Sequence, residues 1–240
     1  MRASGFDMAA GSFMTVSADD GSCTLADFTV SGYDAPVWDD EEGEWTEGCD
    51  GTFVVQILTS SGTVQSKYAW YDNGEVPKGW YNSNGSAISG GASSVKLKAG
   101  MAVWIQGRGM KLTSAGAVNE SDIDFVARAS GFDAVGNTTP VELSLNQLAV
   151  SGYDAPVWDD EEGEWTDGCD GTFVVQFLTS SGTVQSKYAW YDNGELAQGW
   201  YNSNGTAISG GASSVKLPAG SGVWIQGRGM TLRIPAPELN

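Results

Sequence analysis

An internal repeat is the feature that most restricts how this chain can fold. Residues 31–110 align with residues 151–230 at an offset of 120 without a gap, and 71 of the 80 positions are identical. Segments this similar adopt the same structure, so the chain contains one structural unit twice. Each unit spans about 115 residues with its flanks, which is the size of a domain and far longer than a solenoid repeat. We therefore predict two domains, over residues 1–118 and 119–240.

The segments between turn signals have the composition of β-strands. Residues 52–60 and 63–72 are rich in β-branched and aromatic side chains and flank a Ser-Ser-Gly turn, which predicts a hairpin. Residues 94–97 and 102–107 flank Ala99-Gly100 and predict a second hairpin. Helical periodicity does not extend over any twelve residues. The fold class we expect is all-β, with two tandem homologous β-sandwich-like domains.

The two copies begin differently. The second copy follows residues 119–127, in which the alternation of residues 123–127 predicts a strand, and nothing comparable precedes Arg2. A second match, Arg-Ala-Ser-Gly-Phe-Asp at residues 2–7 and 128–133, shows that the two units are otherwise matched at their starts. The first copy therefore lacks its opening strand or borrows one. A shortened chain or a strand donated by another subunit would each explain this.

Acidity is concentrated in two short stretches. The net charge is −18, and 16 of the 30 acidic residues lie in residues 34–50 and 154–170. Such a field repels nucleic acid and anionic lipid, and it favours cations or basic partners. No run of 18 apolar residues exists, so we expect no insertion into a membrane.

Each acidic stretch also carries a pair of tryptophans. The sequence Val-Trp-Asp-Asp-Glu-Glu-Gly-Glu-Trp begins at Val37, and Gly43 suits the left-handed position that follows a type I turn. We predict a hairpin with Trp38 and Trp45 close together across the strands. The carboxylates of this hairpin repel one another, so the stretch favours a positively charged partner.

The sequence offers candidates for three kinds of binding: a metal ion, another protein and a glycan. Carboxylate oxygens suit Ca²⁺, although the spacing matches neither an EF-hand nor a calcium nonapeptide, and a solvated acidic loop is the alternative. The candidate metal ligands are Asp39, Asp40, Glu42, Glu44 and Asp50, with Asp159, Asp160, Glu162, Glu164 and Asp170 in the second copy. The chain requires no other cofactor.

The tryptophans of the hairpins are candidates for a protein contact. Tryptophan is enriched at the energetic centres of interfaces, and a neighbouring copy offers Lys67, Lys96 and Arg108. Tandem domains with complementary patches can assemble head to tail. The candidate contact residues are Trp38, Trp45, Trp158 and Trp165, unless these rings fold onto their own domain.

Glycan binding is the alternative function. Residues 70–85 combine tryptophan and tyrosine with asparagine and aspartate, as sugar sites do, but core residues have the same composition. The candidate platform residues are Trp80, Tyr81, Trp200 and Tyr201.

Catalysis has little support in the sequence. The chain has no histidine, which excludes histidine bases and histidine-ligated metals. Exposed carboxylates stay ionised and cannot act as the protonated acid of a glycosidase, so we expect no enzyme.

Cys23, Cys49 and Cys169 are candidates for one disulfide or an intermolecular bridge, and three buried thiols are the alternative.

Short motifs outside the acidic stretches resemble secreted bacterial proteins built of tandem β-repeats. They are Val-Lys-Leu-Pro-Ala-Gly-Ser-Gly-Val-Trp-Ile-Gln-Gly at 215–227, the segment 131–154 and Ile-Pro-Ala-Pro-Glu-Leu at 234–239. No activity is assigned to such repeats. The resemblance implies an extracellular or cell-surface location and no catalytic residue. Residues 1–13 lack the apolar stretch of a signal peptide, so secretion would require that one has been removed.

Together these features predict a secreted or surface protein with a structural or adhesive role. We expect other copies of the same chain to be its partners in a filament or layer, with a tandem glycan-binding module as the alternative.

Overall fold

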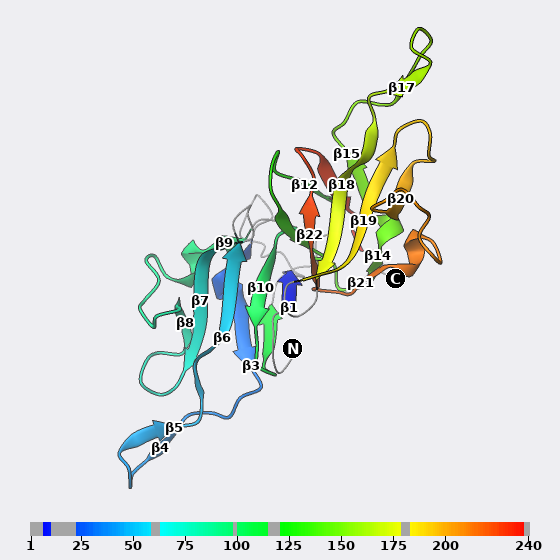
Figure 1. Cartoon of the computed structure of the whole chain (residues 1–240). Helices are drawn as coiled ribbons and strands as arrows, with labels where there is room; N and C mark the ends of the chain where they lie inside the picture. The colour runs from blue at the N-terminus through cyan, green and yellow to red at the C-terminus, as the bar shows by residue number, and fades with distance from the viewer. Residues whose placement is uncertain are drawn as a thin grey trace.

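The computed structural model describes residues 7–10, 23–58, 63–97, 100–114, 121–178 and 183–237, and this part of the chain is all-β (Figure 1). Its helical elements are 3-10 turns of three residues, and none of them is long or apolar enough to cross a membrane. The predicted all-β class is therefore confirmed. We call residues 7–114 the first half and residues 121–237 the second half.

The strands of the first half are β1 (Asp7–Ala10), β2 (Cys23–Thr24), β3 (Phe28–Ser31), β4 (Val37–Asp39), β5 (Glu44–Thr46), β6 (Cys49–Leu58), β7 (Val64–Asp72), β8 (Gly79–Asn82), β9 (Lys96–Leu97), β10 (Ala102–Gln106) and β11 (Lys111–Ser114). Those of the second half are β12 (Ile123–Val126), β13 (Asp133–Gly136), β14 (Leu143–Ser144), β15 (Ala149–Ser151), β16 (Val157–Asp159), β17 (Glu164–Thr166), β18 (Cys169–Leu178), β19 (Val184–Asp192), β20 (Gly199–Asn202), β21 (Lys216–Leu217), β22 (Gly222–Gln226) and β23 (Thr231–Ile234). The 3-10 turns are η1 (Leu25–Asp27), η2 (Ala92–Ser94), η3 (Leu145–Gln147) and η4 (Ala212–Ser214).

Each half contains one antiparallel five-stranded sheet. The strand order is β1-β10-β6-β7-β8 in the first half and β13-β22-β18-β19-β20 in the second. The hairpin predicted over 52–60 and 63–72 is confirmed as β6 and β7, in which Val55 pairs with Tyr68. Residues 53–56 of β6 are all buried, because the strand lies in the middle of the sheet with both faces covered.

The hairpin predicted over 94–97 and 102–107 is wrong. β9 pairs with β2, whereas β10 joins the large sheet between β1 and β6. Leu97 is 2% exposed and lies opposite the buried Cys23. The two segments thus belong to different sheets. Pairing with β2 buries the apolar side chain of Leu97, which is more favourable than leaving it in an exposed hairpin.

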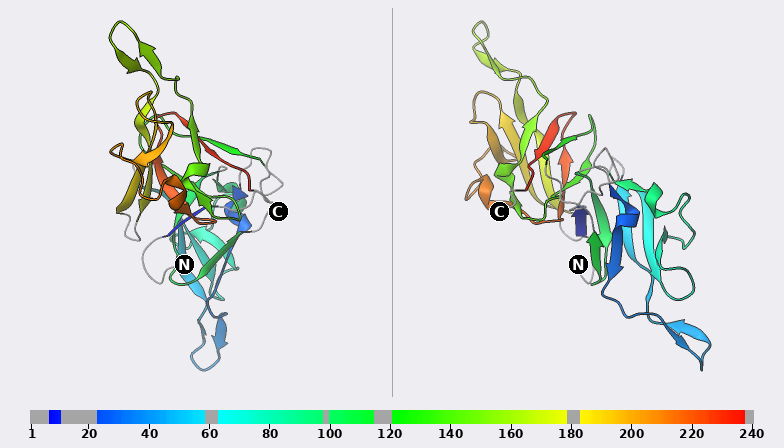
Figure 2. Two further views of the ribbon diagram at one scale, coloured as in Figure 1. Left: turned by 90° about the vertical axis from the view of Figure 1, so that its right-hand side faces the viewer. Right: turned by 180° about the vertical axis from the view of Figure 1, so that it is seen from behind.

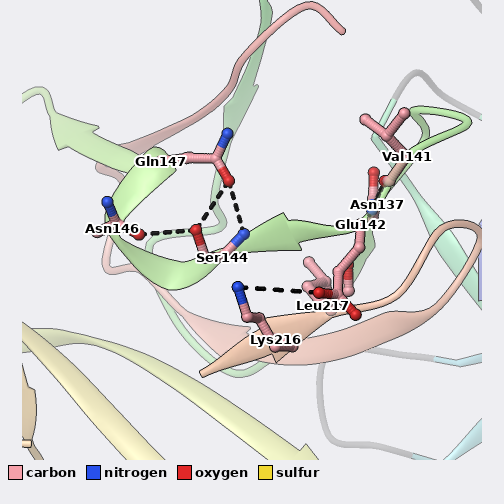
Figure 3. A network of polar contacts seen from close by, with 8 residues as sticks. All are labelled: Asn137, Val141, Glu142, Ser144, Asn146, Gln147, Lys216 and Leu217. Carbon is pink, nitrogen blue, oxygen red and sulfur yellow. Dashed lines mark hydrogen bonds and ion pairs between the residues drawn. The ribbon is translucent and has the colours of Figure 1, made fainter. Parts of the chain in front are cut away.

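A polar network holds the corresponding strand pair of the second half. The amide and hydroxyl groups of Ser144 both donate hydrogen bonds to Oε1 of Gln147, at 2.8 Å each, and so close the η3 turn (Figure 3). Nδ2 of Asn137 donates to the carbonyl oxygen of Leu217 at 2.9 Å, and Lys216 pairs with Glu142 across β14 and β21. These contacts link residues 137–147 to β21, although the buried hydroxyl of Thr138 has no hydrogen-bond partner among the described residues.

Buried apolar residues form two clusters. One is drawn from residues 23–112 and contains Phe53, and the other is drawn from residues 123–234 and contains Phe173; both rings are 0% exposed. All three cysteines are buried free thiols, so the disulfide alternative is not realised in the structure. Cys23 occupies the position of Leu143 in the second half, because each pairs with the corresponding leucine, Leu97 or Leu217.

The two halves meet through corresponding surfaces. The ring of Trp104 on β10 lies 6.1 Å from that of Trp224 on β22, and these residues are the same position of the repeat. Met101 bridges to Val135, and the amide of Gly136 donates to the carbonyl of Gly100 at 2.9 Å. Contact between like surfaces relates two units by an approximate two-fold axis. The hairpins of β4–β5 and β16–β17 consequently point away from each other at opposite ends of the molecule (Figures 1 and 2).

Candidate functional site

The two projecting hairpins are the candidate site, and we call them the tryptophan hairpins: residues 37–46 and 157–166. Both predicted hairpins are present, with Trp38 directly opposite Trp45 and Trp158 directly opposite Trp165. The turn forms because Asp39 Oδ1 accepts the amides of Glu41 and Glu42, at 2.8 and 3.1 Å. Gly43 then adopts a φ of 71°, as the glycine position predicts.

The paired rings are exposed on the outside of the molecule. Trp38 and Trp45 are 47% and 40% exposed, and their ring centroids lie 5.5 Å apart in an edge-to-face arrangement. Trp158 and Trp165 repeat these values. Most of the large exposed apolar side chains in the described residues belong to these two hairpins, since Val37 and Val157 are exposed beside the rings. Exposed tryptophan pairs are unusual on a surface that meets only water.

One ring of each pair is fixed from below by a glycine. A Cβ atom built on Gly74 would lie 2.1 Å from the ring of Trp45, and Gly194 has the same relation to Trp165. Only glycine permits this contact, and its φ of 80° also favours glycine. Trp45 is therefore seated on the turn after β7, which leaves Trp38 as the outer ring. The Asp-Asn-Gly sequence of residues 72–74 indicates a turn but carries no sign of this contact.

The base of the hairpin is fixed by a second group of contacts. The amide of Gly48 donates to the carbonyl of Asp34 at 3.0 Å, which closes the hairpin where it leaves the sheet. Glu47 follows β5 with a φ of 61°, and Asp167 has the same value in the second copy. The change from Glu47 to Asp167 is the only sequence difference between the two acidic stretches. Residues other than glycine adopt such angles at a cost, and aspartate tolerates them better than glutamate.

Asp72 is held beneath the hairpin of the first copy. Tyr33 donates to Asp72 Oδ2 at 2.8 Å, and Nζ of Lys78 lies 2.8 Å from the same oxygen. Burial raises the pKa of Asp72, but the hydrogen bonds from Lys78 and Tyr33 outweigh it and bring the pKa below its usual value. In the second copy Gln198 replaces Lys78 and donates to Asp192 at 2.8 Å.

The candidate metal ligands do not converge. Among the described residues, no three acidic or cysteine side chains are grouped so that they could hold an ion. Asp39 is engaged by its own turn, Asp50 Oδ1 accepts Nδ2 of Asn73 at 3.0 Å, and Asp40, Glu42 and Glu44 are exposed. The matching residues of the second copy behave alike: Asp159 and Asp170 accept hydrogen bonds, and Asp160, Glu162 and Glu164 are exposed. Calcium binding stays a prediction to which this geometry adds no support.

The candidate glycan platform is divided between core and surface. Trp80 and Trp200 are 7% and 6% exposed, and each indole nitrogen donates to a backbone carbonyl, that of Phe28 or Leu148. A ring buried to this extent offers no face to a sugar. Tyr81 and Tyr201 are half-buried, and each hydroxyl donates to the backbone, at Pro77 or Ala197.

An open cleft of about 480 Å³ lies elsewhere on the second half. The edge-to-face pair of Phe177 and Tyr188, 5.8 Å apart, contributes to its wall, together with Asn202, Gln185 and Lys216. Sequence analysis did not single out these residues. The amide groups are ordinary on a strand surface, and only the fold brings them beside the rings.

Comparison with protein-family models, with curated proteins and with solved structures finds no match for this chain.

Proposed function

We propose that this protein is an extracellular or cell-surface structural or adhesive protein that assembles with other copies of itself into a filament or layer. The observation that carries the proposal is the presence of two identical hairpins with exposed tryptophan pairs at opposite ends of one molecule (Figure 1). A molecule with like contacts at both ends can join two neighbours.

The energy available from the rings is sufficient for a specific contact. The exposed parts of Trp38 and Trp45 amount to roughly 100 Å² each, and burying both would contribute about 5 kcal/mol before the cost of association. Trp38 is the more exposed ring of the pair. The glycine seat under Trp45 fixes the pair in advance, so that little conformational entropy is lost on binding.

The charges around the rings favour a basic surface as the receptor. Lys67, Lys96 and Arg108 are exposed, as are their counterparts in the second half, Lys187, Lys216 and Arg228. Because the two hairpins of neighbouring molecules repel each other, a hairpin would dock on these cations of another copy rather than on another hairpin. Assembly would then weaken as salt rises.

We propose further that each half is a β-sandwich-like domain, over residues 1–118 and 119–240. Each half has its own buried cluster, to which both the five-stranded sheet and the smaller sheets contribute residues. The resemblance of the sequence to secreted bacterial tandem β-repeats supports the extracellular location.

The test is light scattering and negative-stain imaging of four proteins: the natural chain, Trp38→Ala with Trp45→Ala, Trp158→Ala with Trp165→Ala, and the variant with all four changes. The natural chain should form large assemblies at low salt. Each single-hairpin variant should form smaller ones, and the four-fold variant should be monomeric with an unchanged circular dichroism spectrum. A natural chain that is monomeric at every salt concentration would refute self-assembly.

Glycan binding is the second candidate, and the cleft beside Phe177 and Tyr188 is the observation that favours it. Aromatic rings with nearby amides suit a sugar ring. The first half has Ile57 in place of Phe177, so the two copies would bind sugar unequally. A glycan array with the natural chain, Tyr188→Ala and the matched Tyr68→Ala would test this. Binding lost only in Tyr188→Ala would support the cleft, and no binding by the natural chain would dismiss it.

A further inference from the structure

The last strands of the two halves, β11 and β23, have different neighbours. β23 lies between β12 and β15 in a three-stranded sheet. β11 pairs with β3, the counterpart of β15, and with no other strand of the described residues. An edge strand presents every second backbone amide and carbonyl group to whatever lies beside it.

Identical side chains on these two strands differ in burial between the halves. Met230 and Leu232 are 7% and 1% exposed, whereas Met110 and Leu112 at the same repeat positions are only partly buried. The cover in the second half comes from β12 and the residue after it: Phe125 pairs with Leu232, and the amide of Ala127 donates to the carbonyl of Met230 at 2.9 Å. Ala127 also packs closely on Gly227, because a Cβ atom built on Gly227 would lie 2.3 Å from the Cβ atom of Ala127.

We propose that the edge of β11 that faces away from β3 is a binding site for an extended segment of another polypeptide with the chemistry of β12. The second half shows what such a segment contains. Ile123 and Ala127 are buried and Phe125 is half-buried, while Asp124 and Val126 between them are exposed. The segment therefore has apolar residues at its first, third and fifth positions. It adds to the sheet by antiparallel pairing.

Three of the four residues of β11 differ from those of β23, because Lys111, Thr113 and Ser114 stand where β23 has Thr231, Arg233 and Ile234. The change at Arg233 bears on the second position of the partner. Arg233 of β23 holds Asp124 through two hydrogen bonds, from Nε at 2.8 Å and Nη2 at 2.9 Å. Thr113 occupies the position of Arg233 in β11. The β11 site therefore lacks the two hydrogen bonds that Arg233 gives to an acidic residue at the second position of the partner. Ser114 stands where Ile234 lies opposite the first position, so the apolar third position, opposite Leu112, contributes most to recognition.

This site is independent of the tryptophan hairpins, so either proposal can fail alone. The probe is a synthetic peptide of residues 119–127, Asn-Glu-Ser-Asp-Ile-Asp-Phe-Val-Ala, added to the whole chain. The control peptide carries Ile123→Asp and Phe125→Asp. β23 should not exchange its partner for the peptide, because β12 is tethered at a high effective concentration.

Hydrogen exchange with mass spectrometry reads the result strand by strand. Without peptide, residues 111–114 should exchange at least about tenfold faster than residues 231–234. The natural peptide, but not the control, should slow exchange at 111–114, and it should lower the rate of Met110 oxidation by peroxide towards that of Met230. An edge as protected as β23 in the free chain, or one that a saturating peptide leaves unchanged, overturns the proposal.

A gain-of-function variant separates strand addition from non-specific sticking. Thr113→Arg should tighten binding of the natural peptide about fivefold or more, since an arginine–carboxylate pair forms two parallel hydrogen bonds. A peptide with Asp124→Asn should bind the natural chain as well as the parent peptide does, and it should gain nothing from Thr113→Arg. Equal effects on both peptides would contradict the inferred register.

Discussion

Replacing Gly74 by alanine should unseat Trp45 and weaken the hairpin of the first copy. The new Cβ would lie 2.1 Å from the ring, so the ring must leave. Two costs add. A left-handed backbone costs an L-residue about 1–2 kcal/mol. Trp45 is 40% exposed, so roughly 150 Å² of the side chain is covered, and losing half of that cover costs about 2 kcal/mol. We therefore expect about 3–4 kcal/mol less stability in the hairpin and its support.

Gly43→Ala is the matched control. Gly43 also has a positive φ, 71°, but nothing lies within 4 Å of a Cβ built there. It should incur only the backbone cost of about 1–2 kcal/mol. Urea denaturation followed by tryptophan fluorescence measures the difference, and acrylamide quenching reports whether a ring has become more accessible. Equal losses in the two variants, or unchanged quenching in Gly74→Ala, would refute the seating of Trp45 on Gly74.

Three further predictions concern the first half. Glu47→Gly should raise stability by about 1 kcal/mol in thermal denaturation, because glycine adopts the φ of 61° without strain; a lower melting temperature would contradict this. The pKa of Asp72 is lowered by Lys78 and Tyr33, so this carboxylate stabilises the fold above its unfolded pKa of about 3.9, and that contribution is lost as the pH falls through the folded value. Lys78→Gln should raise the pKa of Asp72 in an NMR titration and shift acid unfolding to higher pH. An unchanged titration would show that Lys78 does not lower the pKa of Asp72. Burial raises the pKa of the Cys23 thiol to about 11, so it should resist iodoacetamide at pH 8 until urea unfolds the chain, and rapid labelling of the native protein would be the contrary result.

The local structure of the hairpins could be predicted from the sequence because its causes are local. An acidic turn ending in Gly43 lies between two short segments that each contain one tryptophan. Those signals specify a hairpin wherever it is attached. The strand at residues 123–127 and the β6–β7 hairpin were predictable for the same reason, since alternation and turn residues lie side by side in the chain.

The remaining structure depends on contacts between distant residues. The segment 94–107 has the signals of a hairpin, yet Leu97 is buried beside Cys23, which lies far earlier in the chain. The contact between Trp104 and Trp224 and the seat of Trp45 on Gly74 have no local signature either. Trp80 shows most directly what the sequence leaves undecided. A tryptophan in this context is consistent with a sugar platform or with a core position until its burial is known.

In the proposed assembly the tryptophan hairpins dock on basic surfaces of other copies. Zero-length carbodiimide cross-linking tests it directly when ¹⁵N-labelled and unlabelled chains are mixed. Mixed-isotope links should form between the carboxylates of residues 39–44 or 159–164 and Lys67, Lys96 or their counterparts, and 0.5 M salt should abolish them. Links confined to single chains, or intermolecular links that leave out both hairpins, would contradict it.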